Sequence, residues 1–159
     1  TGGSMITRVG LQDAEYMPAP IKFEAGTQRV SQAVAFAAAV RYLQHLGTEN
    51  VEAWEHELSA RLVEGVQKID GVRLLGPTDP TKRAGLVSLA IEGVHPHDVG
   101  QLLDTQGIAV RVGHHCAQPL HRCAGVTAST RASTYIYNTT EDVDAFLKAL
   151  AEVRPYFGF

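Results

Sequence analysis

The 159-residue sequence has little cysteine, little net charge and no long apolar run. Its two cysteines, Cys116 and Cys123, are too few for the disulfide framework of a secreted domain, so we expect a reducing, cytoplasmic setting. Four lysines and ten arginines are scattered, and the net charge is -3, so nothing favours a nucleic-acid partner. Because no apolar stretch reaches the roughly 18 residues of a membrane helix, no membrane partner is expected.

The pattern of apolar residues predicts an α+β fold. Residues 1–27 are expected to be irregular, because Pro18 and Pro20 interrupt regular structure. Helical spacing predicts helices at about 31–46, 48–69, 96–106 and 119–124, with a last one from 139 or 140 onward. Compact apolar runs predict strands over 72–75, 86–91, 108–110 and 130–137, with a loop over 78–83. We therefore expect a short, mainly antiparallel sheet with helices on one face, preceded by a long helix and an irregular segment.

A single cysteine stands among basic side chains in Arg111-Val112-Gly113-His114-His115-Cys116-Ala117-Gln118-Pro119. Cysteine reacts as the thiolate, and nearby cations lower the pKa of a thiol. Gly113 allows the backbone to bend sharply. One interpretation is a mobile loop that carries an activated sulfur nucleophile. The other is a semi-buried structural cysteine beside two surface histidines.

A loop of this composition could serve in three chemistries. Structural zinc is disfavoured, because His114, His115 and Cys116 are consecutive and cannot all face one metal without strain, and Cys123 adds no familiar zinc spacing. A thiol peptidase needs a family-specific surround that is missing from the sequence. Sulfur transfer needs an exposed thiol that can swing, and it is the third option.

Two arginines provide the charge that a small anionic substrate would need. Arg111 lies close to the loop and could bind a carboxylate. Arg131, at the start of an expected strand, could hold a carboxylate through two parallel hydrogen bonds. For each arginine the alternative is an ordinary surface ion pair.

Six motifs in order resemble the C-terminal part of a SufS-type cysteine desulfurase, a class V, fold-type-I enzyme that uses pyridoxal phosphate. They are Gly2-Gly3-Ser4-Met5-Ile6, Lys22 to Thr27, Gly107 to Arg111, Gly113 to Ala117 with Pro119-Leu120, Arg131-Ala132-Ser133 and Tyr137-Asn138-Thr139. The resemblance is specific because the motifs keep the order and spacing of the family. It implies that residues 1–30 form an interface and cofactor-phosphate segment of the large domain. Residues 31–159 would then form a linker helix and the small C-terminal domain that carries the cysteine loop.

The resemblance also implies roles for individual residues. Cys116 resembles the nucleophile that takes sulfur from L-cysteine and holds it as a persulfide, leaving L-alanine. Arg131 resembles the arginine that binds the substrate α-carboxylate, and Arg111 the arginine at the active-site entrance. Thr27 resembles the threonine that reaches the cofactor phosphate of the other protomer, which implies a homodimer. The sulfur would supply iron–sulfur cluster assembly.

His97 resembles a histidine that replaces a zinc ligand of a SufU-type sulfur acceptor when that zinc-dependent partner docks. Neutral imidazole is a good zinc ligand, so the exchange is chemically reasonable. No metal site is expected within the isolated chain. The alternative is that His95 and His97 are only exposed residues at the start of a helix.

The sequence departs from the family in its lysines. The family attaches pyridoxal phosphate through a lysine after a histidine, and Lys22, Lys68, Lys82 and Lys148 have no such setting. We therefore expect the cofactor to bind through a lysine outside this segment, and the segment alone to be inactive. Two further interpretations stay open: a non-catalytic docking fragment, and a related class V enzyme that acts on selenocysteine. Cys123 is expected to pack in the short helix.

Overall fold

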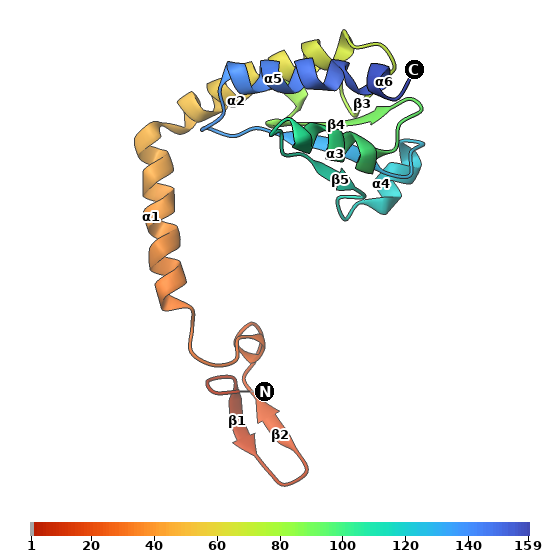
Figure 1. The fold of residues 1–159 in the computed structure, drawn as a ribbon. Helices are drawn as coiled ribbons and strands as arrows, with labels where there is room; N and C mark the ends of the chain where they lie inside the picture. Colours follow the sequence, from red (N-terminus) through yellow and green to blue (C-terminus); the bar gives the residue numbers. More distant parts are fainter. Residues whose placement is uncertain (1) are drawn as a thin grey trace. The chain divides into compact units, whose positions relative to one another are not determined.

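The computed structural model describes residues 2–159, which form two units. One unit ends at Gly47 and the other runs from Thr48 to Phe159. Figure 1 shows the helices and strands of each unit along the chain.

The first unit contains a hairpin that the sequence analysis did not predict. Strands β1 (Ile6–Val9) and β2 (Ala14–Tyr16) pair antiparallel, so the expectation of an irregular segment over residues 1–27 is wrong there. Arg8 joins the two strands by ion pairs to Asp13 at 2.7 Å and Glu15 at 2.9 Å. Its strands are mostly exposed, and the apolar Ile6 and Val9 of β1 are three residues apart, so the alternating apolar pattern of a half-buried strand is absent from β1.

The rest of the first unit is a short 3-10 turn, η1 (Ile21–Phe23), and the long helix α1 (Val30–Leu46). The predicted helix over 31–46 is confirmed, and it ends at Gly47, whose φ of 86° suits glycine. Among the described residues of α1 none is buried, although Val34 and Phe36 are apolar. The apolar residues of α1 therefore form no buried core within residues 2–159.

The second unit is a four-stranded antiparallel sheet in the order β3-β4-β6-β5. Its strands are β3 (Val72–Leu75), β4 (Leu86–Ile91), β5 (Arg111–Gly113) and β6 (Ser129–Ser133). Its helices are α2 (Thr48–Gln67), α3 (Pro96–Thr105), α4 (Gln118–Cys123), α5 (Thr140–Ala151) and α6 (Val153–Tyr156), with a 3-10 turn η2 (Pro80–Lys82). The predicted α+β fold with a small antiparallel sheet is confirmed.

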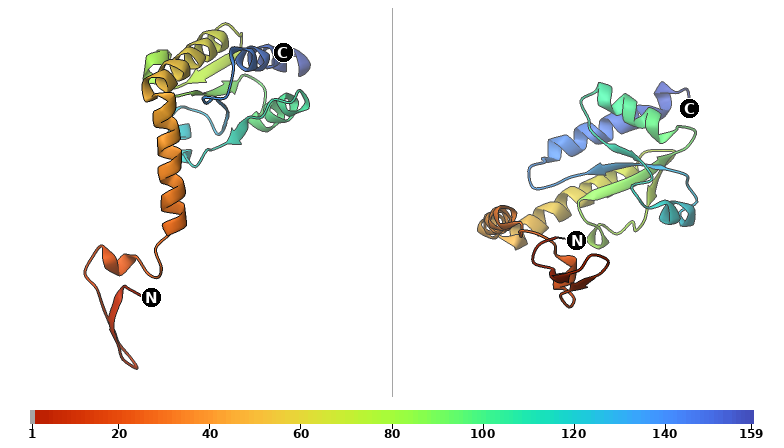
Figure 2. Two further views of the ribbon diagram at one scale, coloured as in Figure 1. Left: turned by 90° about the vertical axis from the view of Figure 1, so that its left-hand side faces the viewer. Right: turned by 90° about the horizontal axis from the view of Figure 1, so that it is seen from below.

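Three helices cover one face of this sheet and bury the core against it. Alternate residues of β4, namely Val87, Leu89 and Ile91, point into that core. The helix residues that meet them include Leu58 and Leu62 of α2, Val99 and Leu103 of α3, and Phe146 and Leu150 of α5. Figure 2 shows α2 and α5 side by side over the sheet. The other face of the sheet receives α4 and the loop that precedes it.

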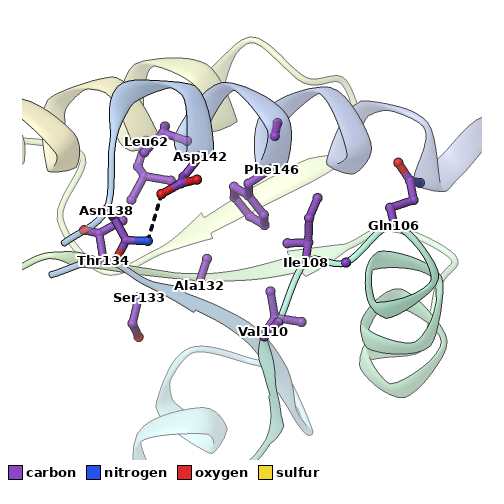
Figure 3. A pocket seen from close by; sticks show the side chains of 14 residues that line it. Leu62, Gln106, Ile108, Val110, Ala132, Ser133, Thr134, Asn138, Asp142 and Phe146 are labelled. Atoms are coloured by element: carbon purple, nitrogen blue, oxygen red, sulfur yellow. Dashed lines mark hydrogen bonds between the residues drawn. The ribbon is translucent and has the colours of Figure 1, made fainter.

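Two strand predictions differ from the structure. β3 and β4 begin and end as predicted, but β5 covers 111–113 instead of 108–110, and β6 ends at Ser133 instead of 137. The segment 108–110 borders a pocket with Ala132 and Phe146 instead of pairing with β6 (Figure 3). Beyond β6 the chain turns, because the backbone N–H of Tyr135 donates to the Asn138 side chain at 3.0 Å.

Candidate active site

Cys116 lies at the tip of a tight turn that follows β5. The N–H of Ala117 donates to the carbonyl of His114 at 2.8 Å and closes the turn. Its two central residues, His115 and Cys116, have left-handed φ values of 52° and 59°. For residues other than glycine this conformation costs about 1–2 kcal/mol each. The turn therefore presents an exposed thiol on a strained backbone.

The register of β5 and β6 brings the two arginines together. Arg111 is the direct cross-strand partner of Arg131, so both side chains leave the same face of the sheet. Gly113 pairs with Ser129 on that face, below the turn. The sequence predicts both arginines as ligands for a carboxylate, and this register makes them neighbours.

Neither Arg111 nor Arg131 has a carboxylate partner among residues 2–159, and Nε of Arg131 is buried without a hydrogen bond. Two like charges opposite each other destabilise a sheet. An anionic ligand between them would relieve the repulsion and would use the forked geometry of the guanidinium group. The pair therefore fits a carboxylate better than it fits a structural role.

A buried hydroxyl lies beneath the turn and meets two imidazoles. Ser129 is fully buried, and its Oγ lies 3.0 Å from Nε2 of His115 and 2.9 Å from Nε2 of His121. Nδ1 of His121 lies 2.9 Å from the carbonyl oxygen of Ala117 and donates to it. Burial first, and then the charge of Arg131, lower the pKa of His115, so its ring is neutral at pH 7.

Neither His121 nor Ser129 was predicted from the sequence as a site residue. His121 lies in α4 one helical turn after Ala117, and that spacing after the cysteine was the available signal. Ser129 comes below the turn only through its pairing with Gly113, which the sequence does not display.

A shallow hollow around the thiol is lined by Arg111, Val112, His114, His115, Cys116, Gln118 and Pro119. It is open to solvent, so a small molecule can reach the sulfur. Cys123 is the last residue of α4 as expected, but its side chain is exposed instead of packed.

The other two predicted site residues, His97 and Thr27, are not among the residues that line this hollow. His97 is exposed in the first turn of α3, and its backbone N–H donates to Nδ1 of His95 at 3.3 Å. The two imidazole rings stack with centroids 5.4 Å apart. Thr27 is exposed in the first unit, just after Gly26, whose N–H donates to Gly3 at 2.8 Å.

Residues 1–146 match the aminotransferase class-V family. The chain belongs to this family.

Within the family, the curated relatives are named as cysteine desulfurases. A probable cysteine desulfurase of Mycobacterium leprae is 51% identical over 99% of this chain, and one of Halalkalibacterium halodurans is 48% identical over 99%. Among solved structures, the apo cysteine desulfurase of Thermococcus onnurineus is 39% identical over 96% of this chain, with a TM-score of 0.83. CsdA of Escherichia coli, in an S-sulfonic acid form, is 33% identical over 98% of this chain, also with a TM-score of 0.83.

The chain spans 38% of the length of each of these relatives. The resemblance to the C-terminal part of a cysteine desulfurase is thereby confirmed at the level of family and fold.

The family is one of pyridoxal phosphate enzymes, and the described residues fit only part of that cofactor. The exposed hydroxyl of Thr27 is free to donate to a phosphate. No lysine lines the hollow around Cys116 within the part of the chain that the structure describes. These residues therefore do not provide a covalent site for the cofactor.

Residues 2–159 contain no group of three or more His, Cys, Asp or Glu side chains arranged to hold a metal ion. They also contain no helix with the length and apolar character needed to cross a membrane.

Proposed function

We propose that this chain is the small C-terminal domain, with the preceding interface segment, of a cytoplasmic cysteine desulfurase that uses pyridoxal phosphate. The enzyme would convert L-cysteine to L-alanine and supply sulfur for iron–sulfur cluster assembly. The single observation that supports this most is an exposed Cys116 on a strained turn that directly follows β5, whose Arg111 lies opposite Arg131. The relatives named as cysteine desulfurases support the same conclusion.

In the proposed reaction, Arg131 binds the α-carboxylate of the substrate cysteine, and Arg111 contacts the substrate at the entrance. The Cys116 thiolate attacks the substrate sulfur, so an S–S bond forms as the Cβ–S bond breaks. The electron pair of the broken bond stays with carbon, which takes up a proton to give alanine. Pyridoxal phosphate, when bound, makes that carbon accept the electron pair.

The proposal assigns the partner residues as well. The exposed Thr27 hydroxyl would contact the cofactor phosphate of the other protomer in a homodimer. We also propose the division at residue 30, between a large-domain segment and the linker helix with the small domain. Pyridoxal phosphate would be attached through a lysine that this chain does not contain.

The decisive test is mass spectrometry of the full-length enzyme after incubation with free L-cysteine and without reductant. The peptide with Cys116 should gain one sulfur atom, and Cys116→Ala should release no sulfide. Cys123→Ala is the matched control, because this second exposed thiol should leave turnover unchanged. An enzyme that never carries extra sulfur at Cys116 would leave a docking role for this domain instead.

The proposed acceptor is a SufU-type protein whose zinc takes His97 as a ligand. His97 is exposed in the first turn of α3, so its ring can reach a partner. His97→Ala should slow sulfur transfer to the zinc protein at least tenfold, while sulfide release with a chemical reductant stays normal. His95→Ala, which removes the stacked neighbour, separates ring packing from ligation. Normal transfer by His97→Ala would falsify the assignment.

A further inference from the structure

The cysteine turn needs a support that holds its strained backbone. A left-handed conformation at two successive non-glycine residues persists only where the surroundings determine it. The turn's own backbone hydrogen bond joins His114 and Ala117, and the backbone N–H of His121 donates to the Ala117 carbonyl at 3.1 Å. These backbone bonds connect the turn to itself and to α4, so its hydrogen bonds to the sheet beneath come from side chains.

Both sides of Cys116 are tied to one buried hydroxyl. Before the cysteine, the His115 ring reaches Oγ of Ser129 at 3.0 Å. After it, the Ala117 carbonyl is held by His121, whose other nitrogen reaches the same Oγ at 2.9 Å. Ser129 and His121 are 0% and 6% exposed, so water does not compete for these bonds.

The donor and the acceptor of each of these hydrogen bonds follow from the Ala117 carbonyl. The Ala117 carbonyl can only accept, so Nδ1 of His121 carries a proton. In neutral His121, Nε2 then accepts the hydroxyl proton of Ser129. The Ser129 oxygen is left to accept from Nε2–H of His115, which is thereby held in one tautomer.

We propose that Ser129 and His121 are positioning residues that hold the turn of Cys116 in its strained, exposed conformation. They act through His115 and the Ala117 carbonyl and do not touch the reacting sulfur. The effect on turnover rests on the proposed function. The effect on the turn itself does not, because it follows from the hydrogen bonds alone.

The test uses the full-length enzyme with Ser129→Ala, which removes both imidazole contacts at once. Hydrogen exchange of the backbone amides of the turn, above all that of Ala117, should become about tenfold faster. The kcat for cysteine should fall by a similar factor, and KM should stay within about twofold because Arg111 and Arg131 keep their places. Ser129→Thr keeps the hydroxyl and should restore both values.

Thr130→Val is the matched control. Thr130 is equally buried on β6, but it faces the helices and not the turn, and its hydroxyl lies 3.5 Å from the Pro96 carbonyl. This variant should leave exchange in the turn unchanged. Similar acceleration in both variants would show general loosening of β6 and would overturn the proposal.

A second variant tests whether His115, Ser129 and His121 form one chain of hydrogen bonds or two contacts that act independently. His121→Met keeps a good helix former and removes both ring nitrogens. Alone it should accelerate exchange like Ser129→Ala, and the double variant should add nothing further, because both changes break one chain of bonds. Unchanged hydrogen exchange in the single variants, or additive effects when Ser129→Ala and His121→Met are combined, would refute a single chain of hydrogen bonds. If Cys116→Ala keeps full desulfurase activity, the proposed function fails while the exchange result still stands.

Discussion

Cys116 has a left-handed backbone conformation that is unfavourable for residues other than glycine. A φ of 59° is costly for any side chain with a Cβ and costs glycine little. Cys116→Gly should therefore raise the free energy of unfolding by about 0.5–1 kcal/mol relative to Cys116→Ala, measured by urea denaturation. Ala117→Gly is the control, because its φ of -131° is ordinary and glycine there should destabilise. Equal stability of the two Cys116 variants would show that the turn is not strained.

The neutral ring of His115 makes stability depend on pH. Burial and the charge of Arg131 lower the pKa of His115 below its ordinary value of 6.5, so the unfolded chain takes up the proton first as pH falls. The contribution of His115 to stability is complete above pH 6.5 and is lost as pH falls toward its folded pKa. Urea titrations at pH 5.5 and 7.5 should show a smaller difference for His115→Gln than for the wild type. An unchanged difference would contradict the assignment.

Among the elements, α5 carries the clearest local signal for a helix start. Thr139 accepts from the N–H of Asp142, and the Asp142 carboxylate accepts in return from the N–H of Thr139. Thr139→Ala should lower the free energy of unfolding by about 1 kcal/mol, whereas Thr140→Ala, one residue into the helix, should change it much less. Thermal unfolding of the two variants provides the comparison, and equal losses would exclude the cap as the cause.

Helix periodicity and strand alternation predicted the elements that bury one regular face. The apolar stripe of α2 and the alternation of β4 are both used in the core as the sequence indicates. The β1–β2 hairpin was missed because cross-strand ion pairs from Arg8 hold it, and these leave no apolar period. The strand expected at 108–110 was displaced because those apolar residues line a pocket.

On the scale of the molecule, the second unit contains a complete core of its own. Its buried residues come from α2, the sheet, α3, α5 and α6, and all of them lie within 48–159. A protein of residues 48–159 should therefore unfold cooperatively in urea, with coincident transitions by circular dichroism and by Trp54 fluorescence. A peptide of residues 2–47 is the comparison, and it should show no cooperative transition because α1 buries none of its described residues. Gradual unfolding of 48–159 would disprove an independent core.

The amino-acid sequence by itself determined the helices, the strands β3 and β4, and the ordered motifs that identify a class V relative, because these depend on local periodicity and residue identity. Tertiary structure alone decided which side chains meet. The pairing of Arg111 with Arg131 and of Gly113 with Ser129 is a matter of strand register, and a shift of one residue would turn each side chain to the other face. That register follows from burying Thr130 and Val87 against helices that are distant in the sequence. The cysteine turn, the two arginines and the buried Ser129 beneath the turn therefore come together only when the core is packed.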